Sequence, residues 1–265
     1  MIKESLFCRL SKLFLIFAFL ILCILNCAPA SQVGFAKRTV QKFSPALVKI
    51  IFLGATYDRA TGKQTKDTVG GTGVFITEDG FILTADHIVG EGKVGSWPPP
   101  DTGIVHGFEG IWVEMSNGRW KMAGMVTTPD KSLGNDLTLL LLGGDTIYTN
   151  WPHLEIDERD DFSLGEPVVV MGYPSMSQGL TVSEGIVTNI NPNRAEFGMS
   201  ALVTPGSSGG PVITADGKII GIANANRLVW EKGRPWGFAM KGVNVALRKK
   251  RIDELMREQR KNWKK

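Results

Sequence analysis

Cysteine is scarce in this sequence, and its distribution excludes several kinds of site. All three cysteines, Cys8, Cys23 and Cys27, fall within the first 30 of the 265 residues. If that segment is removed after export, the remaining chain has no disulfide, no cysteine nucleophile and no thiolate metal ligand. Its stability must then come from a hydrophobic core, which about 235 residues are long enough to bury.

Histidine is equally rare, and long apolar runs are absent except for one. The three histidines, His87, His106 and His153, are far apart in the sequence. They offer no metal-ligand cluster, so we expect neither a metal nor another cofactor. We expect His106 and His153 to face solvent. The single long apolar run covers residues 13–25, which is too short to cross the hydrocarbon core of a membrane.

The first 30 residues have the organisation of a secretory signal. Basic residues precede the apolar run, and Ala28-Pro29-Ala30 supplies the small residues that a signal peptidase recognises. We therefore predict a signal peptide at 1–30, a mature chain that begins at Ser31, and a location in the periplasm or outside the cell. An uncleaved anchor is one alternative. Lipid attachment at Cys27 is another, although Leu25 and Asn26 fit poorly before a lipidated cysteine.

Helical periodicity is also missing until residue 243. Short apolar runs alternate instead with Gly, Asp, Asn and Pro, as in an all-β barrel or sandwich; they include VFIT (74–77), FILT (81–84), LTLLLL (137–142), ALVT (201–204) and PVIT (211–214). A polar stretch at 143–166 separates two β-rich halves, about 46–142 and 167–245, and is a candidate link between two barrels. We expect residues 31–45 to form a polar, mobile lead-in and 91–110, with three consecutive prolines, to form a surface loop.

The end of the chain differs from the rest in charge and in periodicity. Residues 246–265 contain nine Lys and Arg against three Asp and Glu, within a net charge of +4 for the whole chain. Val245, Ile252, Leu255 and Met256 share one helical face. We predict a basic C-terminal helix that packs on the barrel. Its charged face is either simply solvated or attracted to an anionic membrane surface or another polyanion.

The stretch TPGSSGGPV at 204–212 contains a candidate nucleophile. A serine hydroxyl requires a base, a group that orients the base, and donors for the oxyanion that forms. With Ser208 as nucleophile, Gly206 lies two residues before it and can donate one N–H, while Ser208 donates the other. With Ser207, that position is Pro205, which has no N–H. This favours Ser208, although a plain Ser/Gly turn would also account for the sequence.

His87 and Asp136 are the candidate base and orienting acid. His87 follows a predicted hairpin and strand and lies at the end of that strand, where sites are often built. Asp136 stands directly before the apolar run LTLLLL, where a partly buried carboxylate needs a donor such as an imidazole N–H. Asp136 as a turn residue or strand cap is the alternative. Asp86, adjacent to His87, is rejected as the orienting acid because neighbouring side chains at a strand end point to different sides.

These three segments resemble the trypsin-like serine proteases, most closely the bacterial HtrA/Deg type. The order His, Asp, Ser is that of the chymotrypsin group. Matching segments include GTGVFITEDGFILTADHIV, GNDLTLLLL, TPGSSGGPV and GKIIGIANA, and the similarity extends from about residue 68 to 240. The resemblance implies two antiparallel β-barrels, with His87 and Asp136 on the first and Ser208 on the second. It also implies an oxyanion hole formed by the N–H groups of Gly206 and Ser208.

The sequence also departs from the family. The residue before the nucleophile is Ser207 instead of Asn or Asp, and no sequence for activation by N-terminal insertion is visible. About 25 residues follow GFAM, so we expect no PDZ domain. By the resemblance, Leu202 lies at the base of the substrate pocket, so cleavage after small or medium apolar residues is expected.

The sequence as a whole predicts an exported serine endopeptidase that acts on protein or peptide substrates and does not bind nucleic acid. Two alternatives remain. One is a non-catalytic or regulatory binding protein on a trypsin-like scaffold. The other is an esterase-like hydrolase that uses the same three residues.

Overall fold

The computed structural model describes residues 34–89, 104–127, 132–143, 150–159, 161–174, 179–231 and 234–263. The predicted signal peptide at 1–30 lies outside these residues. None of the described helices is both long and apolar enough to cross a membrane. Residues 35–43 of the predicted lead-in form helix α2 (Phe35–Phe43), which the short helix η1 (Ser44–Ala46) connects to the first strand.

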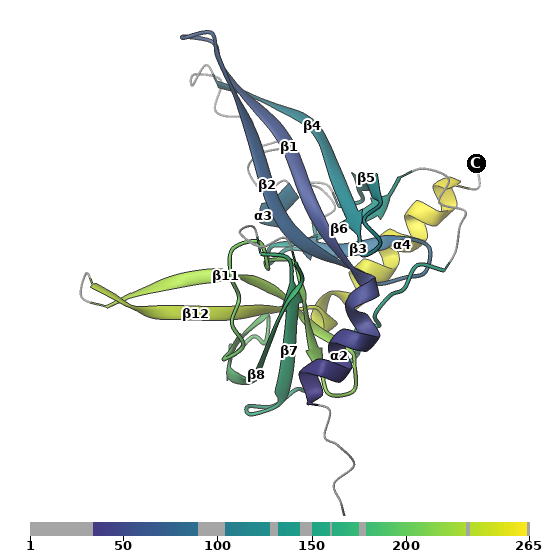
Figure 1. The fold of residues 1–265 in the computed structure, drawn as a ribbon, viewed down its shortest axis with the longest axis vertical. Coiled ribbons are helices and arrows are strands. Elements are labelled where there is room, and N and C mark those ends of the chain that lie inside the picture. The colour runs from purple at the N-terminus through teal and green to yellow at the C-terminus, as the bar shows by residue number, and fades with distance from the viewer. Residues whose placement is uncertain are drawn as a thin grey trace, which may run out of the picture. The chain divides into compact units, whose positions relative to one another are not determined.

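Twelve strands form two closed antiparallel barrels (Figure 1). The first barrel has the order β1-β2-β3-β6-β5-β4 and contains β1 (Leu47–Asp58), β2 (Lys63–Phe75), β3 (Phe81–Ala85), β4 (Ile104–Met115), β5 (Trp120–Met125) and β6 (Leu137–Leu142). The second has the order β10-β11-β12-β9-β8-β7 and contains β7 (Pro167–Gly172), β8 (Thr181–Ile190), β9 (Glu196–Met199), β10 (Pro211–Thr214), β11 (Ile219–Glu231) and β12 (Arg234–Asn244). The predicted all-β double barrel is therefore confirmed.

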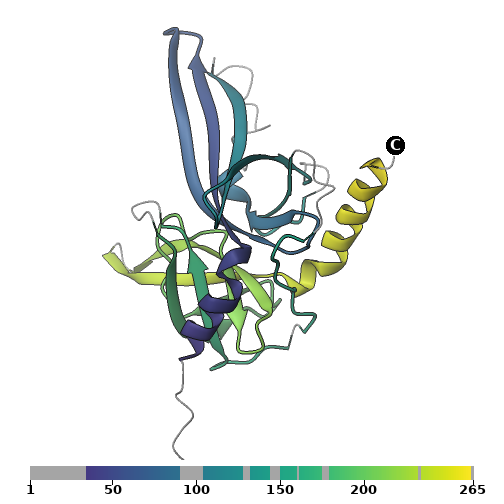
Figure 2. The same cartoon turned by 45° about the vertical axis from the view of Figure 1, so that its right-hand side comes forward.

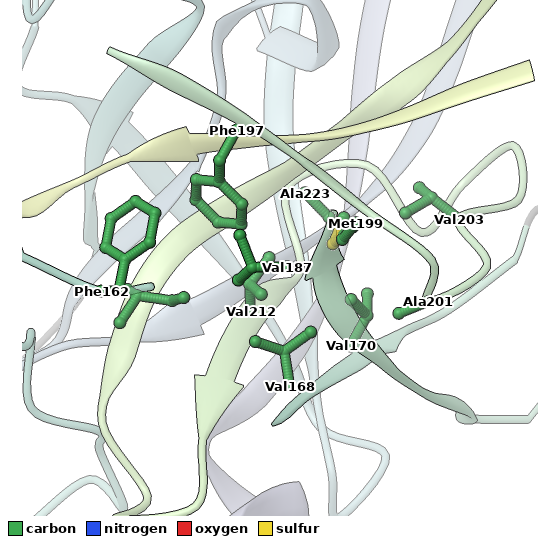
Figure 3. Packing of buried hydrophobic residues seen from close by; sticks show 11 residues of the cluster. Phe162, Val168, Val170, Val187, Phe197, Met199, Ala201, Val203, Val212 and Ala223 are labelled. Atoms are coloured by element: carbon green, nitrogen blue, oxygen red, sulfur yellow. The ribbon is translucent and has the colours of Figure 1, made fainter. Parts of the chain in front are cut away.

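Apolar strands fill the interior of each barrel. All residues of β3 and β6 are buried in the first barrel, as expected for strands whose two faces are covered. In the second barrel, Phe162 meets Phe197 edge to face, with ring centroids 4.9 Å apart. Valine, alanine and methionine side chains of the same buried cluster extend to one side of this pair in the view of Figure 3.

Two sequence expectations are wrong at the level of strands. Residues 104–110 of the predicted surface loop belong to β4, which pairs with β1 from Ile104–Asp58 to Gly110–Leu53. The partner strand lies some fifty residues earlier in the chain, so local glycine content did not indicate this pairing. Residues 201–204 were expected as a strand but join no ladder. In that segment the N–H of Leu202 donates to Ser183 Oγ instead.

The polar stretch after β6 connects the barrels through backbone hydrogen bonds. The N–H of Leu154 donates to Phe75 O in the first barrel at 2.9 Å, and that of Asp157 donates to Ile219 O in the second at 2.8 Å. Trp151 stacks on Phe75, with ring centroids 5.3 Å apart. This stretch therefore contacts both barrels.

The C-terminal helix is confirmed and also contacts both barrels. After η4 (Ala246–Arg248), helix α4 (Lys249–Trp263) leaves the second barrel and extends alongside the first (Figure 2). Its apolar face is buried, as predicted: Ile252 and Leu255 are at most 1% exposed. Near its end, Arg260 donates two hydrogen bonds to Asp79, of 2.6 and 3.0 Å, at the turn before β3.

Candidate active site

His87 lies in a single helical turn that directly follows strand β3 of the first barrel. Strand β3 ends at Ala85, and α3 (Asp86–Val89) follows at once. The N–H of Asp86 donates to Asp136 O at 3.0 Å. This bond fixes the start of α3 beside the residue that precedes β6, so His87 and Asp136 meet across two adjacent strands.

Three donors surround the carboxylate of Asp136. The backbone N–H of His87 donates to Oδ1 at 2.7 Å, and His87 Nδ1 lies 2.6 Å from Oδ2. Asn224 Nδ2 donates to Oδ2 at 2.6 Å. The Asp136 side chain is only 16% exposed. Because a carboxylate can only accept, the Nδ1 atom of a neutral His87 carries the proton and Nε2 is left as an acceptor.

The backbone before Asp136 is in an unusual conformation. Gly134, Asn135 and Asp136 all have positive φ, of 69°, 51° and 58°. Asn and Asp adopt this left-handed region more readily than other residues with side chains, but the conformation still carries strain. Three successive residues of this kind bring Asp136 back towards α3 directly before it enters β6.

The loop that carries Ser208 is held by its own backbone. The N–H of Ser207 donates to Thr204 O at 2.8 Å, and the N–H of Gly209 donates to Ala223 O at 2.8 Å. Gly206 has φ +92°, which a glycine adopts without steric cost. Among the described residues, the N–H groups of Gly206 and Ser208 donate to no protein acceptor. One available N–H donor therefore lies on each side of Ser207, at Gly206 and at Ser208.

The structure brings Ser208 into the neighbourhood of the other two residues. Ala223, which accepts from Gly209, directly precedes Asn224, which donates to Asp136. A side chain added at Gly209 would lie 3.0 Å from Cδ1 of Ile88, the residue after His87, and 2.0 Å from Thr72 O. Glycine is required there because two barrels approach closely at this point. Within the described part of the chain, no hydrogen bond joins Ser208 Oγ to His87.

The two adjacent serines differ in their surroundings. Ser207 is 3% exposed, and its hydroxyl lies 3.1 Å from Thr204 Oγ1, so it already has a partner. Ser208 is 4% exposed, and no hydrogen bond of its hydroxyl is found among the described residues. Of the two hydroxyls, that of Ser208 is therefore the one without a hydrogen-bond partner among the described residues.

A model of the trypsin-like peptidase domain matches residues 71–222 of the chain. The chain belongs to the trypsin-like peptidase family.

Several proteins resemble this trypsin-like peptidase domain. The chain is 24% identical over 205 residues to a probable periplasmic serine endoprotease, DegP-like, of Chlamydia muridarum, and covers 36% of that protein. It is 27% identical over 206 residues to serine protease HTRA1 of Xenopus tropicalis, covering 39% of it. These alignments include 75% and 74% of the chain. The chain thus spans little more than a third of the length of these relatives.

A solved structure shows the same fold. The crystal structure of the serine endoprotease from Yersinia pestis superposes with a TM-score of 0.58 at 24% identity, over 86% of this chain and 68% of that one. At this identity the likeness supports the fold of the peptidase domain alone.

Asp86 is a second carboxylate beside the candidate site of this peptidase domain. Thr138 Oγ1 donates to Asp86 Oδ1, whereas the partner of His87 Nδ1 is Asp136. Burial raises the pKa of Asp86 above its ordinary value, and the nearby charge of Asp136 adds to this effect. The site therefore contains two acidic groups with different neighbours.

The other residues singled out by sequence lie in different settings. Leu202 is 56% exposed, and its place at the base of a pocket stays a prediction. His153 is exposed, as expected. The backbone of His106 is part of β4, and its side chain lies outside what the structure describes. Within the described ranges, no group of three or more His, Cys, Asp or Glu residues could hold a metal ion.

Sequence reasoning missed two residues of the peptidase domain's candidate site. Asn224 is the third donor to Asp136, and Thr72 joins the Ser208 loop to the first barrel. Asn224 is the single polar residue of the segment GIANA, and Thr72 is the single polar side chain in the segment GGTGV. That was the only signal available, because their partners are distant in the sequence.

Proposed function

We propose that this chain is an exported serine endopeptidase that cleaves unfolded proteins or peptides. In this proposal Ser208 attacks the scissile carbonyl, and His87 accepts its proton and later donates it to the leaving amine. Asp136 holds the imidazole tautomer and stabilises the imidazolium that forms. The N–H groups of Gly206 and Ser208 bind the oxyanion of the tetrahedral intermediate.

One observation carries the proposal: His87 is held by Asp136 through both its backbone N–H and its Nδ1 atom. A histidine fixed in this way presents Nε2 with its lone pair free, which is the arrangement that a general base requires. The missing bond between Ser208 and His87 does not argue against it. Catalytic hydrogen bonds are often long without substrate and shorten when substrate binds.

Labelling with a fluorophosphonate and digestion of casein test the proposal. Ser208→Ala should abolish labelling and lower turnover by several orders of magnitude, leaving roughly 10³–10⁴-fold catalysis over water from the remaining donors and binding. Ser207→Ala is the matched control, because it removes a neighbouring buried hydroxyl. It should keep labelling and lose about 1 kcal/mol of stability with the hydrogen bond to Thr204.

Other results would favour the alternative functions. Labelling that persists in Ser208→Ala and disappears in Ser207→Ala would reverse the assignment of the nucleophile. A wild-type protein that neither labels nor cuts would be a non-catalytic binding protein. Turnover of small esters without any cleavage of casein would indicate an esterase-like hydrolase.

The proposed cleavage preference is for small or medium apolar residues before the scissile bond. Leu202 offers an exposed apolar side chain and no carboxylate that could pair with Lys or Arg. Apolar pockets discriminate by only about 1–3 kcal/mol for each methylene, so the preference should be graded. Mapping of casein cut sites tests this, and a clear majority of cuts after Lys or Arg would contradict it.

We also propose that α4 attracts the protein to an anionic membrane surface. Lys250, Arg257 and Lys261 are exposed and share one helical face, opposite the buried face. Lys249, by contrast, lies 2.9 Å from Asp253 in an ion pair. Reversing the three exposed charges should weaken binding to phosphatidylserine vesicles at low salt, whereas Lys249→Glu alone should have a smaller effect. Equal binding by the triple variant and the wild type would refute the idea.

A further inference from the structure

Thr72 connects the first barrel to the loop that carries Ser208. It lies on β2 and is completely buried. Its N–H donates to Ser208 O at 2.9 Å, and its hydroxyl donates to Gly206 O at 2.8 Å. Both acceptors belong to the second barrel's loop, so a single residue of the first barrel holds two carbonyls of that loop.

The direction of the Thr72 hydroxyl is fixed by a third partner. The N–H of Tyr173, directly after β7, donates to Thr72 Oγ1 at 2.8 Å. A hydroxyl has one proton and two lone pairs. Because Tyr173 takes a lone pair, the proton is directed to Gly206 O. Thr84 Oγ1 in turn donates to Thr72 O at 2.6 Å, which anchors Thr72 within its own barrel.

These bonds decide which way the peptide groups of the loop face. The carbonyls of Gly206 and Ser208 are held by Thr72, and the N–H of Ser207 is held by Thr204 O. The N–H groups of Gly206 and Ser208 remain without protein acceptors among the described residues. The carbonyl of Gly206 and the N–H of Ser207 belong to one peptide group, so Thr72 and Thr204 together hold that group. It lies between the two peptide groups that carry the N–H groups of Gly206 and Ser208, and its orientation therefore restricts theirs. Because glycine tolerates a wide range of φ and ψ, Gly206 adds little restraint of its own.

We infer that Thr72 is a positioning residue that keeps the N–H groups of Gly206 and Ser208 aimed at the oxyanion. The inference rests on the proposed function. It adds that the geometry of the oxyanion hole on the second barrel depends on a hydroxyl of the first. Proper contact between the two barrels is then a condition for turnover.

Thr72→Val tests this inference, since valine has nearly the same shape and lacks the hydroxyl. Gly206 O and Tyr173 N–H would both lose a partner, and the loop could rotate. We expect kcat to fall about 10- to 100-fold, less than or similar to the loss of one oxyanion donor, with KM changed less than about threefold. Thr72→Ser keeps the hydroxyl and should retain kcat within about threefold.

Thr127→Val is the matched control for stability. Thr127 is also a buried threonine of the first barrel, and its Oγ1 accepts from Leu139 N–H at 3.3 Å. It should lower Tm without lowering kcat. The inference would be overturned if Thr72→Val kept wild-type kcat, if Thr72→Ser lost as much as Thr72→Val, or if Thr127→Val lost an equal amount.

Hydrogen exchange separates this inference from the proposed function. Measured in the Ser208→Ala background, amide exchange over residues 204–210 should be faster with Thr72→Val and unchanged with Thr127→Val. If the wild type fails to label with fluorophosphonate, the proposed function is wrong, yet the exchange result still shows whether Thr72 holds the loop. Equal exchange with and without Thr72→Val would refute the inference in either case.

Discussion

Replacing Asn224 with alanine should weaken the candidate site without dismantling it. Asn224 Nδ2 is one of three donors to the Asp136 carboxylate, and the other two come from His87. A hydrogen bond to a charged group contributes about 1.5–3 kcal/mol, because an uncompensated buried charge is costly. Asn224→Ala removes that bond and leaves the carboxylate with two donors.

The magnitude follows from how that energy divides between folding and catalysis. If about half is lost from the folded ground state, stability falls by about 0.8–1.5 kcal/mol, and Tm falls by roughly 1.5–6 °C for a chain of this size. The remainder appears in the transition state, where Asp136 must stabilise an imidazolium. Since 1.4 kcal/mol is tenfold in rate, we expect kcat to fall about 3- to 15-fold. KM should change little.

Calorimetry and casein turnover measure the two effects, and Asn224→Asp is the informative second variant. It replaces a donor 2.6 Å from Asp136 with another carboxylate. Two carboxylates so close cannot both be ionised without a large repulsion, so kcat should fall much further than with alanine. The reasoning would be refuted if Asn224→Ala kept both wild-type Tm and kcat, or if Asn224→Asp were as active as Asn224→Ala.

Further predictions concern stability, its pH dependence, and processing. Burial alone would raise the pKa of Asp79, but the hydrogen bonds and charge of Arg260, together with hydrogen bonds from Thr77 and the backbone, outweigh burial, and the pKa lies below the ordinary 3.8. The pair therefore stabilises the fold above that pH and ceases to do so in stronger acid. Arg260→Ala should cost about 1 kcal/mol at pH 7, and its Tm should approach the wild type's near pH 2; a constant difference would contradict this. Asp86 has the opposite sign: because burial raises its pKa, its ionised form destabilises the fold as pH rises above 3.8. Asp86→Asn keeps an oxygen for Thr138 and should raise Tm at pH 7 but not near pH 3, and an unchanged Tm at pH 7 would count against it. N-terminal sequencing of the exported protein should begin at Ser31, and an intact Met1 would exclude cleavage.

Much of the fold could be predicted from local sequence. The runs FILTA and LTLLLL become the buried strands β3 and β6, because such β-rich apolar segments have no other favourable place than a sheet interior. The apolar face of the last helix was equally readable, since Ile252, Leu255 and Met256 repeat at helical spacing and are buried. Local pattern failed at residues 104–110, where pairing with β1 made a strand of a glycine-containing segment.

The candidate residues themselves were also accessible from the sequence, but their relations were not. His87, Asp136 and Ser208 could be selected because each stands at a chemically distinctive place beside an apolar run or among glycines. The distance of 2.6 Å between His87 and Asp136 depends on the positive φ angles before β6 and on the bond between Asp86 and Asp136. No pattern in the sequence predicted the positive φ angles before β6.

The sequence alone determined the strand-rich architecture, the basic C-terminal helix and the residue types that can perform nucleophilic catalysis, because these follow from periodicity and from side-chain chemistry. Only the tertiary structure decided that Asn224 supports Asp136 and that Thr72 holds the carbonyls of Gly206 and Ser208. These contacts join residues 88 and about 135 positions apart. The physical reason is that a hydrogen bond depends on position and direction in space, and both are set by how two closed barrels pack against each other.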